Sequence, residues 1–164
     1  MEELELLGEG SSFQDQLFDM VADATMFSQF SGTEIRQLVK YMHAYTAPAG
    51  TVIFREGAPC SGMGLLVSGS IEVSKEDSSG VTKALATILP GRTFGEMSVL
   101  DGLPYSATAR AMKDSVVAIL TRHNFRTLVD SHAAMGVKLL WELARLTSLR
   151  LRQTSGQLVD VLGQ

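Results

Sequence analysis

The chain has 164 residues, 45% of them hydrophobic and 20% charged, so it can bury one core without a disulfide or a structural metal. Its formal net charge of -4 leaves no electrostatic footprint for DNA or RNA. The single cysteine, Cys60, excludes an intramolecular disulfide and a cluster of thiolate metal ligands.

The N-terminal segment does not have the composition of a signal peptide. Met1–Gly10 is acidic and lacks the basic stretch and apolar run of a signal peptide, and no other stretch reaches about 18 apolar residues. We therefore expect a cytoplasmic protein without a membrane span. Residues 1–12 are polar and contain two glycines, so we expect a loose tail before a domain over residues 13–164.

Two helices are predicted at the start of this domain. The first rests on apolar residues at helical spacing, namely Phe13, Leu17, Phe18 and Val21. The second begins at Ser31-Gly32-Thr33-Glu34, where Ser31 caps the helix and Glu34 returns the hydrogen bond. Its apolar stripe is Ile35, Leu38, Val39 and Met42.

After Pro48 and Gly50, short β-branched and apolar runs alternate with glycine turns, which predicts strands. Many short strands at this spacing indicate a β-roll over about residues 48–121. We expect the strands at about Thr51–Phe54, Gly64–Val67, Ser70–Ser74, Lys83–Leu89, Ser106–Ala111 and Ser115–Leu120.

Helical spacing returns over about residues 122–155. It predicts a short helix at Phe125–Val129 and a long one at Ala133–Gln153, with Gly156 as the stop. This order predicts an α+β fold, in which N-terminal helices precede a jelly-roll-like antiparallel sandwich and a long C-terminal helix.

The segment Phe94–Ala111, FGEMSVLDGLPYSATARA, is predicted to form a turn, a short helix, a loop and a strand. It resembles the phosphate-binding cassette of cyclic nucleotide-binding domains of the catabolite activator and protein kinase A regulatory type. The family pattern is Phe-Gly-Glu, a small apolar helix, then Pro-Arg-Ser/Ala-Ala-Thr, and only the arginine is missing. The resemblance covers about residues 27–155, because the family's strand and turn order is also followed by Phe54-Arg55-Glu56-Gly57, residues 65–73 and Leu89-Pro90-Gly91.

The resemblance implies a ligand and a role for each site residue. Glu96 would accept a hydrogen bond from the ribose 2′-hydroxyl, and Ser106 with the backbone N–H groups of Gly95 and Met97 would hold the cyclic phosphate. In the bacterial activator a Thr-Ser pair reads the adenine edge near a dimer axis, which implies cAMP as the ligand. The remaining expected site residues are Phe94, Ser98, Ala107, Thr154 and Ser155.

Position 105 holds tyrosine where the family has the arginine that grips the phosphate. A guanidinium offers two charged N–H donors side by side, which a phenol cannot reproduce. Loss of that contact with the phosphate costs on the order of 2–4 kcal/mol of binding free energy. Tyr105 itself, Arg150 or Arg92 are the candidates to replace that contact, whereas Arg110 lies at an odd offset and faces the other side of its strand.

Two functions therefore remain open. The chain is either a sensor module that binds cAMP at the cassette, or a degenerate domain that serves as a dimerisation or protein-docking scaffold without nucleotide. Both imply a homodimer through the C-terminal helix and an unidentified partner protein. The stripe expected to pack the second copy has 3-4 spacing and consists of Leu140, Leu143, Thr147, Arg150 and Thr154.

Other classes of function lack their motifs. The three histidines, His43, His123 and His132, lie far apart and outside the predicted strands, which disfavours a metalloenzyme of the cupin kind. No Gly-x-Ser-x-Gly elbow occurs, so we expect no enzyme activity. Only nine residues follow Ser155, too few for a helix-turn-helix, so we expect no direct DNA binding.

Overall fold

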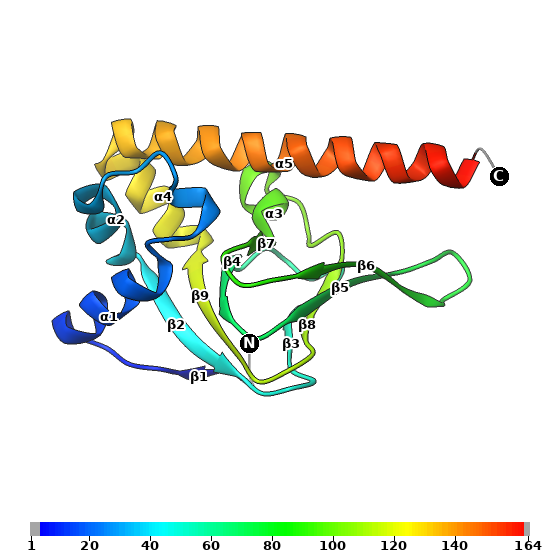
Figure 1. The fold of residues 1–164 in the computed structure, drawn as a ribbon, viewed down its shortest axis with the longest axis horizontal. Helices are drawn as coiled ribbons and strands as arrows, with labels where there is room; N and C mark the ends of the chain where they lie inside the picture. Colours follow the sequence, from blue (N-terminus) through cyan, green and yellow to red (C-terminus); the bar gives the residue numbers. More distant parts are fainter. Residues whose placement is uncertain (1–3, 163–164) are drawn as a thin grey trace.

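A computed structural model describes residues 4–162 and shows two antiparallel sheets, with helices at one end and a long C-terminal helix that runs along one side of the molecule (Figure 1). The strands are β1 Glu5–Leu6, β2 Met42–Ala47, β3 Val52–Phe54, β4 Gly62–Ser68, β5 Ile71–Glu76, β6 Thr82–Ile88, β7 Thr93–Phe94, β8 Thr108–Ala111 and β9 Ser115–Thr121. The helices are α1 Ser11–Val21, a 3-10 turn η1 Thr25–Phe27, α2 Gly32–Val39, α3 Glu96–Asp101, α4 Arg122–Ser131 and α5 Ala133–Leu162.

The two sheets pack face to face and form the predicted β-roll. One has the strand order β1-β2-β9-β4-β7 and the other β3-β8-β5-β6. Their inner faces share one buried apolar cluster, which includes Leu66, Ile71, Phe94, Val117 and Ile119. The α+β architecture expected from the sequence is thus confirmed.

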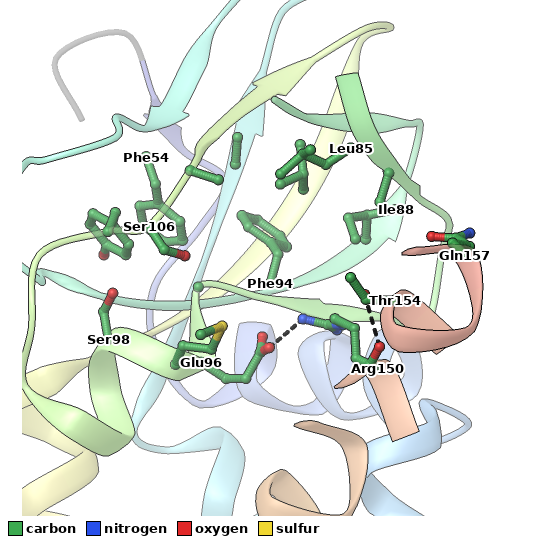
Figure 2. A pocket seen from close by; sticks show the side chains of 17 residues that line it. Phe54, Leu85, Ile88, Phe94, Glu96, Ser98, Ser106, Arg150, Thr154 and Gln157 are labelled. Carbon is green, nitrogen blue, oxygen red and sulfur yellow. Dashed lines mark hydrogen bonds and ion pairs between the residues drawn. The ribbon is translucent and has the colours of Figure 1, made fainter. Parts of the chain in front are cut away.

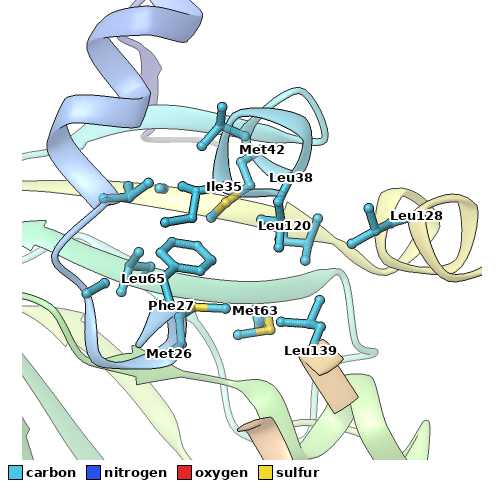
Figure 3. Packing of buried hydrophobic residues seen from close by; sticks show 14 of the residues in the cluster. Met26, Phe27, Ile35, Leu38, Met42, Met63, Leu65, Leu120, Leu128 and Leu139 are labelled. Atoms are coloured by element: carbon cyan, nitrogen blue, oxygen red, sulfur yellow. The ribbon is translucent and has the colours of Figure 1, made fainter. Parts of the chain in front are cut away.

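A second cluster packs the helices against the end of the larger sheet (Figure 3). Full burial of each such side chain contributes roughly 1.5–3 kcal/mol to the free energy of folding. Because α5 supplies Leu139 and Leu143 to this cluster, the first half of the long helix is fixed to the domain. Other members are Met26, Phe27, Leu38, Met63, Leu120 and Leu128.

The cap predicted for α2 is confirmed. The Ser31 hydroxyl oxygen accepts from the Glu34 N–H at 3.3 Å, and the Ser31 N–H donates to a Glu34 carboxylate oxygen at 2.7 Å. The apolar stripe predicted for this helix wrongly included Met42, because α2 ends at Val39 and Met42 is the first residue of β2. Met42, Ala44 and Ala47 are buried while the residues between them are partly exposed, which is the pattern of a half-buried strand.

The N-terminal segment is more ordered than the loose tail expected over residues 1–12. Glu5 and Leu6 pair with Thr46 and Tyr45 of β2, and α1 already begins at Ser11. The first three residues of that expected tail lie outside the described residues. The strands also begin before residue 48, because β2 starts at Met42.

The C-terminal helix differs from its prediction at its end and in its orientation. It runs for 30 residues through Gly156, so the predicted stop is wrong. A lone glycine in an exposed helix costs only about 1 kcal/mol relative to alanine, which a long helix tolerates. Most of the stripe expected to face a second copy instead faces the domain, since Leu143 is 0% exposed and Leu140, Thr147 and Arg150 are partly buried, while Thr154 is exposed. Among residues 4–162, no helix is both long and apolar enough to cross a membrane.

Candidate ligand-binding site

A cavity of about 290 Å³ lies between the predicted cassette, the sheet β3-β8-β5-β6 and α5 (Figure 2). This volume is close to the lower end of the range of about 300–1,000 Å³ that is usual for small-molecule sites. Its lining residues are Phe54, Val73, Leu85, Ala86, Ile88, Phe94, Gly95, Glu96, Met97, Ser98, Tyr105, Ser106, Ala107, Ala109, Arg150, Thr154 and Gln157.

The cassette begins with a turn that requires glycine. Gly95 has φ of +75°, in the left-handed region, and a Cβ there would approach the Phe54 ring at 2.8 Å. This turn redirects the chain from β7 into α3, whose first residue is Glu96. The Phe-Gly-Glu sequence thus places a carboxylate at the start of a short helix, against the cavity.

Glu96 and Arg150 form an ion pair between the cassette and α5, drawn as a dashed line in Figure 2. The Glu96 side chain is only 1% exposed, and its Oε2 has no hydrogen-bond partner within residues 4–162. Arg150 also donates to the backbone carbonyl of Thr93 at 3.0 Å. One guanidinium therefore holds α5 to two points of the cassette region, while one buried carboxylate oxygen remains free to accept from a ligand.

Tyr105 is a wall of the cavity, and its hydroxyl is bonded to the protein. The ring stacks on Phe54 with centroids 4.5 Å apart and is 5% exposed. The hydroxyl donates to the Gly62 carbonyl at 2.6 Å and accepts from the N–H groups of Ser61 and Gly62 at 3.1 and 3.0 Å. Burial raises the pKa of this phenol above its ordinary value. The side chain therefore anchors the cassette to β4, and its proton is not available to a phosphate.

The other predicted site residues divide into two groups. Arg150 and Thr154 line the cavity from α5, but Ser155 does not and is exposed. Of the remaining candidate cations, Arg92 borders only a smaller hollow beside α5, and Arg110 donates to the Gly50 carbonyl at 2.8 Å. Arg150 is thus the one arginine that lines this cavity. The cassette residues that do line it are Phe94, Gly95, Glu96, Met97, Ser98, Tyr105, Ser106 and Ala107.

Several lining residues were missed by the sequence analysis. Gln157 follows Thr154 by three residues, so helical spacing would have placed it on the same face had the helix not been ended at Gly156. The apolar wall of the cavity comes from β5, β6 and β8. The apolar runs in the sequence predicted these strands, but they could not predict which face of the sheet would line a cavity. Its members are Val73, Leu85, Ala86, Ile88 and Ala109.

The described residues provide no group of three or more His, Cys, Asp and Glu side chains arranged to hold a metal ion. The polar chemistry of the cavity is instead one carboxylate, one guanidinium, hydroxyls and the amide of Gln157. These groups suit hydrogen bonding to a hydroxylated ligand with an apolar part.

Comparison with known proteins gives the family. A model of the cyclic nucleotide-binding domain matches residues 46–132. A CRP-like cAMP-activated global transcriptional regulator of Mycobacterium tuberculosis is 26% identical over 144 residues, which cover 88% of this chain and 62% of the regulator. A cyclic nucleotide-gated potassium channel of Mesorhizobium japonicum is 31% identical over 137 residues, 82% of this chain and 35% of the channel.

The solved structures agree with this match. A cyclic nucleotide-binding domain from Methylobacillus flagellatus superposes with a TM-score of 0.84 and 28% identity, covering 97% of this chain and 89% of that one. The chain therefore spans nearly all of that domain but less than two thirds of the curated relatives above. The family is a regulatory ligand-binding domain that occurs in such larger proteins. This chain belongs to the cyclic nucleotide-binding domain family.

Proposed function

We propose that this domain is a regulatory module that senses cAMP in the cytoplasm, and that it is not an enzyme. The observation that carries this proposal is the position of the cavity, which the cassette bounds on one side and α5 on another (Figure 2). A ligand there would touch both the cassette and the helix that extends past the domain.

The lining groups suggest a pose for the nucleotide. The free Oε2 of Glu96 would accept a hydrogen bond from the ribose 2′-hydroxyl. The N–H groups at the start of α3, the Ser106 hydroxyl and the remaining N–H groups of Arg150 would surround the cyclic phosphate. The apolar side chains of β5 and β6 would then cover the base, and Thr154 of α5 would also lie next to it.

Arg150 would couple the ligand to α5. Its guanidinium donates hydrogen bonds to Glu96 and to the Thr93 carbonyl. A ligand that binds to Glu96 would therefore alter one of the two contacts by which Arg150 holds α5 against the domain. The equilibrium of α5 shifts only if the ligand binds one helix position better than another. Direct contact of the ligand with Thr154 on the same helix supplies such a difference.

One observation favours a second candidate, a scaffold that works without nucleotide. The Tyr105 hydroxyl is satisfied by Ser61 and Gly62, and Glu96 is neutralised by Arg150, so the cassette and α5 are held in place without a ligand. Both candidates use α5 as the output element.

We infer that α5 pairs with α5 of a second copy, through a face other than the one expected from the sequence. Successive 3-4 spacing marks an exposed stripe, defined here as Val137, Trp141, Ala144, Ser148, Leu151, Ser155, Leu158 and Leu162. Trp141, 74% exposed, lies on this stripe.

A seven-residue repeat of apolar and small residues is typical of a two-stranded coiled coil.

Calorimetric titration with cAMP and cGMP, to millimolar concentration, tests the sensor proposal. We expect saturable cAMP binding by the wild-type chain and weaker binding by Glu96→Gln, because the amide replaces the carboxylate acceptor. Tyr105→Arg serves as the positive control. No heat of binding in the wild type, together with binding by Tyr105→Arg, would contradict the sensor proposal and support the scaffold.

A further inference from the structure

A second, smaller hollow lies beside α5 and has a volume of about 70 Å³. Its walls come from η1, from the loop before β7 and from α5, three segments that are distant in the sequence. One water needs roughly 10–15 Å³ of such a volume, so the hollow has room for a tetrahedral oxyanion. Thr25 and Gln153 line it with a hydroxyl and a carboxamide, which can both donate hydrogen bonds. The described residues around it include no carboxylate, and Arg150 is the one residue that it shares with the larger cavity.

Two guanidinium groups border this hollow. Arg92 borders it from the loop before β7, and Arg150 from α5. Both terminal nitrogens of Arg150 already donate once, to Glu96 and to the Thr93 carbonyl, but each carries a second N–H. Glu96 balances the charge of Arg150, so Arg92 leaves one positive charge uncompensated among the residues that line the hollow. Positive charge presented by planar N–H donors favours an oxyanion as ligand.

A buried hydroxyl gives an independent indication of a ligand. Thr93 borders the hollow and is 2% exposed, and its Oγ1 has no hydrogen-bond partner within residues 4–162. A buried hydroxyl without a partner is costly, so a bound water or ion is the usual explanation for one. The Thr93 proton needs an acceptor, whereas the guanidinium groups that border the same hollow are only donors. An oxyanion would accept from the hydroxyl and from both guanidinium groups at once, and it would also balance the charge.

We propose that this hollow is a binding site for a free tetrahedral oxyanion, inorganic phosphate or sulfate, held by Arg92, Arg150 and the Thr93 hydroxyl. The ion would tie α5 to the loop before β7 at the point where the helix leaves the domain, since residues 151–160 are exposed. It would thus regulate the position of α5 from a site separate from the nucleotide cavity. The proposal does not depend on nucleotide binding.

Calorimetric titration of the nucleotide-free protein with sodium phosphate and with sodium sulfate tests the site, with sodium chloride keeping the ionic strength constant. We expect saturable binding of both ions at millimolar concentrations. Arg92→Gln should weaken phosphate binding about tenfold, because it removes the uncompensated charge. Thr93→Val removes the hydroxyl and keeps the shape of the side chain, and it should weaken phosphate binding about threefold to tenfold.

Arg152→Gln is the matched control. It makes the same change of net charge on α5, but Arg152 does not line the hollow, so phosphate affinity should stay within about twofold of the wild type. Urea denaturation gives a second readout, in which phosphate should raise the free energy of unfolding of the wild type and not that of Arg92→Gln.

The proposal is overturned if the wild type binds neither ion, or if Arg152→Gln weakens phosphate binding as much as Arg92→Gln does. Phosphate binding that is lost in Ser106→Ala and kept in Arg92→Gln would place the ion in the cassette and would equally contradict the proposal. A phosphate affinity that Thr93→Val leaves unchanged would show that the buried hydroxyl does not hold an ion, against the proposal.

Discussion

The hydroxyl of Tyr105 connects the end of the cassette to the start of β4. Its partners are the backbone groups of Ser61 and Gly62, and its ring stacks on Phe54. The family's arginine would direct its charge at the ligand, whereas the Tyr105 hydroxyl donates its one proton to the backbone carbonyl of Gly62. The cassette is thereby fixed before any ligand arrives.

Tyr105→Phe removes this hydroxyl and nothing else. We expect the free energy of unfolding to fall by about 1–3 kcal/mol, because two backbone N–H groups and one carbonyl lose their partner in a buried place. Chemical denaturation measures the loss. Tyr45→Phe is the control, since Tyr45 is a partly exposed tyrosine of β2, and it should change stability by less than about 0.5 kcal/mol. Equal effects of the two variants would show that the Tyr105 hydroxyl has no anchoring role.

Individual site residues could be predicted where a local motif fixes them. Gly95 and Glu96 follow from the Phe-Gly-Glu sequence, because the left-handed turn and the helix start are local features. The partners of Tyr105 and Arg150 could not be predicted, since Ser61 and Glu96 lie 44 and 54 residues away in the sequence. Only the tertiary packing decides which of these groups meet.

At the scale of elements, α2 and α5 are joined by the ion pair of Glu34 and Lys138, 2.7 Å apart. The Lys138 ammonium, followed by the Ser31 N–H, lowers the pKa of Glu34 below its usual value. A carboxyl whose pKa is lowered on folding stabilises the protein above its unfolded pKa, about 4.3, and loses that effect as the pH falls through the folded pKa.

Glu34→Gln tests this link through its pH dependence. Glutamine keeps the reciprocal cap but drops the charge, so near neutral pH we expect a loss of less than about 1 kcal/mol in the free energy of unfolding. Urea denaturation from neutral pH to pH 3 or so should show the difference between wild type and variant shrinking below about pH 4.3. A difference that stays constant with pH would exclude the ion pair as its cause.

Most elements could be predicted from the sequence, and those that could not have physical reasons. The capping box located α2, and apolar runs between glycine turns located β3, β4, β5, β6, β8 and β9. The strand β2, Met42–Ala47, was missed because its first residue continued the apolar stripe of the preceding helix. The two-residue strands β1 and β7 are too short to show a period, and each forms only by pairing with a strand distant in sequence. The end of α5 was predicted wrongly because a glycine near the end of a helical pattern can either stop the helix or be tolerated inside it.

The orientation of α5 also required the tertiary structure. Two interleaved stripes with 3-4 spacing run along this helix, one with Leu140 and Leu143 and one with Leu151 and Leu158. Burial assigns the first to the domain and leaves the second exposed. Sequence spacing alone could not separate them, since both satisfy the same period.

At the scale of the whole molecule, the exposed stripe predicts a dimer that one charge would disrupt. We expect Leu151→Glu to shift the wild-type chain from dimer to monomer in analytical ultracentrifugation, because it places two carboxylates at the centre of the seam. Val81→Glu makes the same change at an exposed residue of the β5–β6 turn and should leave the mass unchanged. A monomeric wild type at high protein concentration would rule out the dimer.

The account as a whole states that one ligand contacts the cassette and α5 together. Hydrogen–deuterium exchange of the full chain, with and without saturating cAMP, measures this directly, because protection reports local opening at each amide. We predict slower exchange in residues 94–107 and in α5 from Arg150 to Gln157, with β1 and β2 unaffected. Protection confined to the cassette, or none at all, would contradict the coupling of nucleotide to the C-terminal helix.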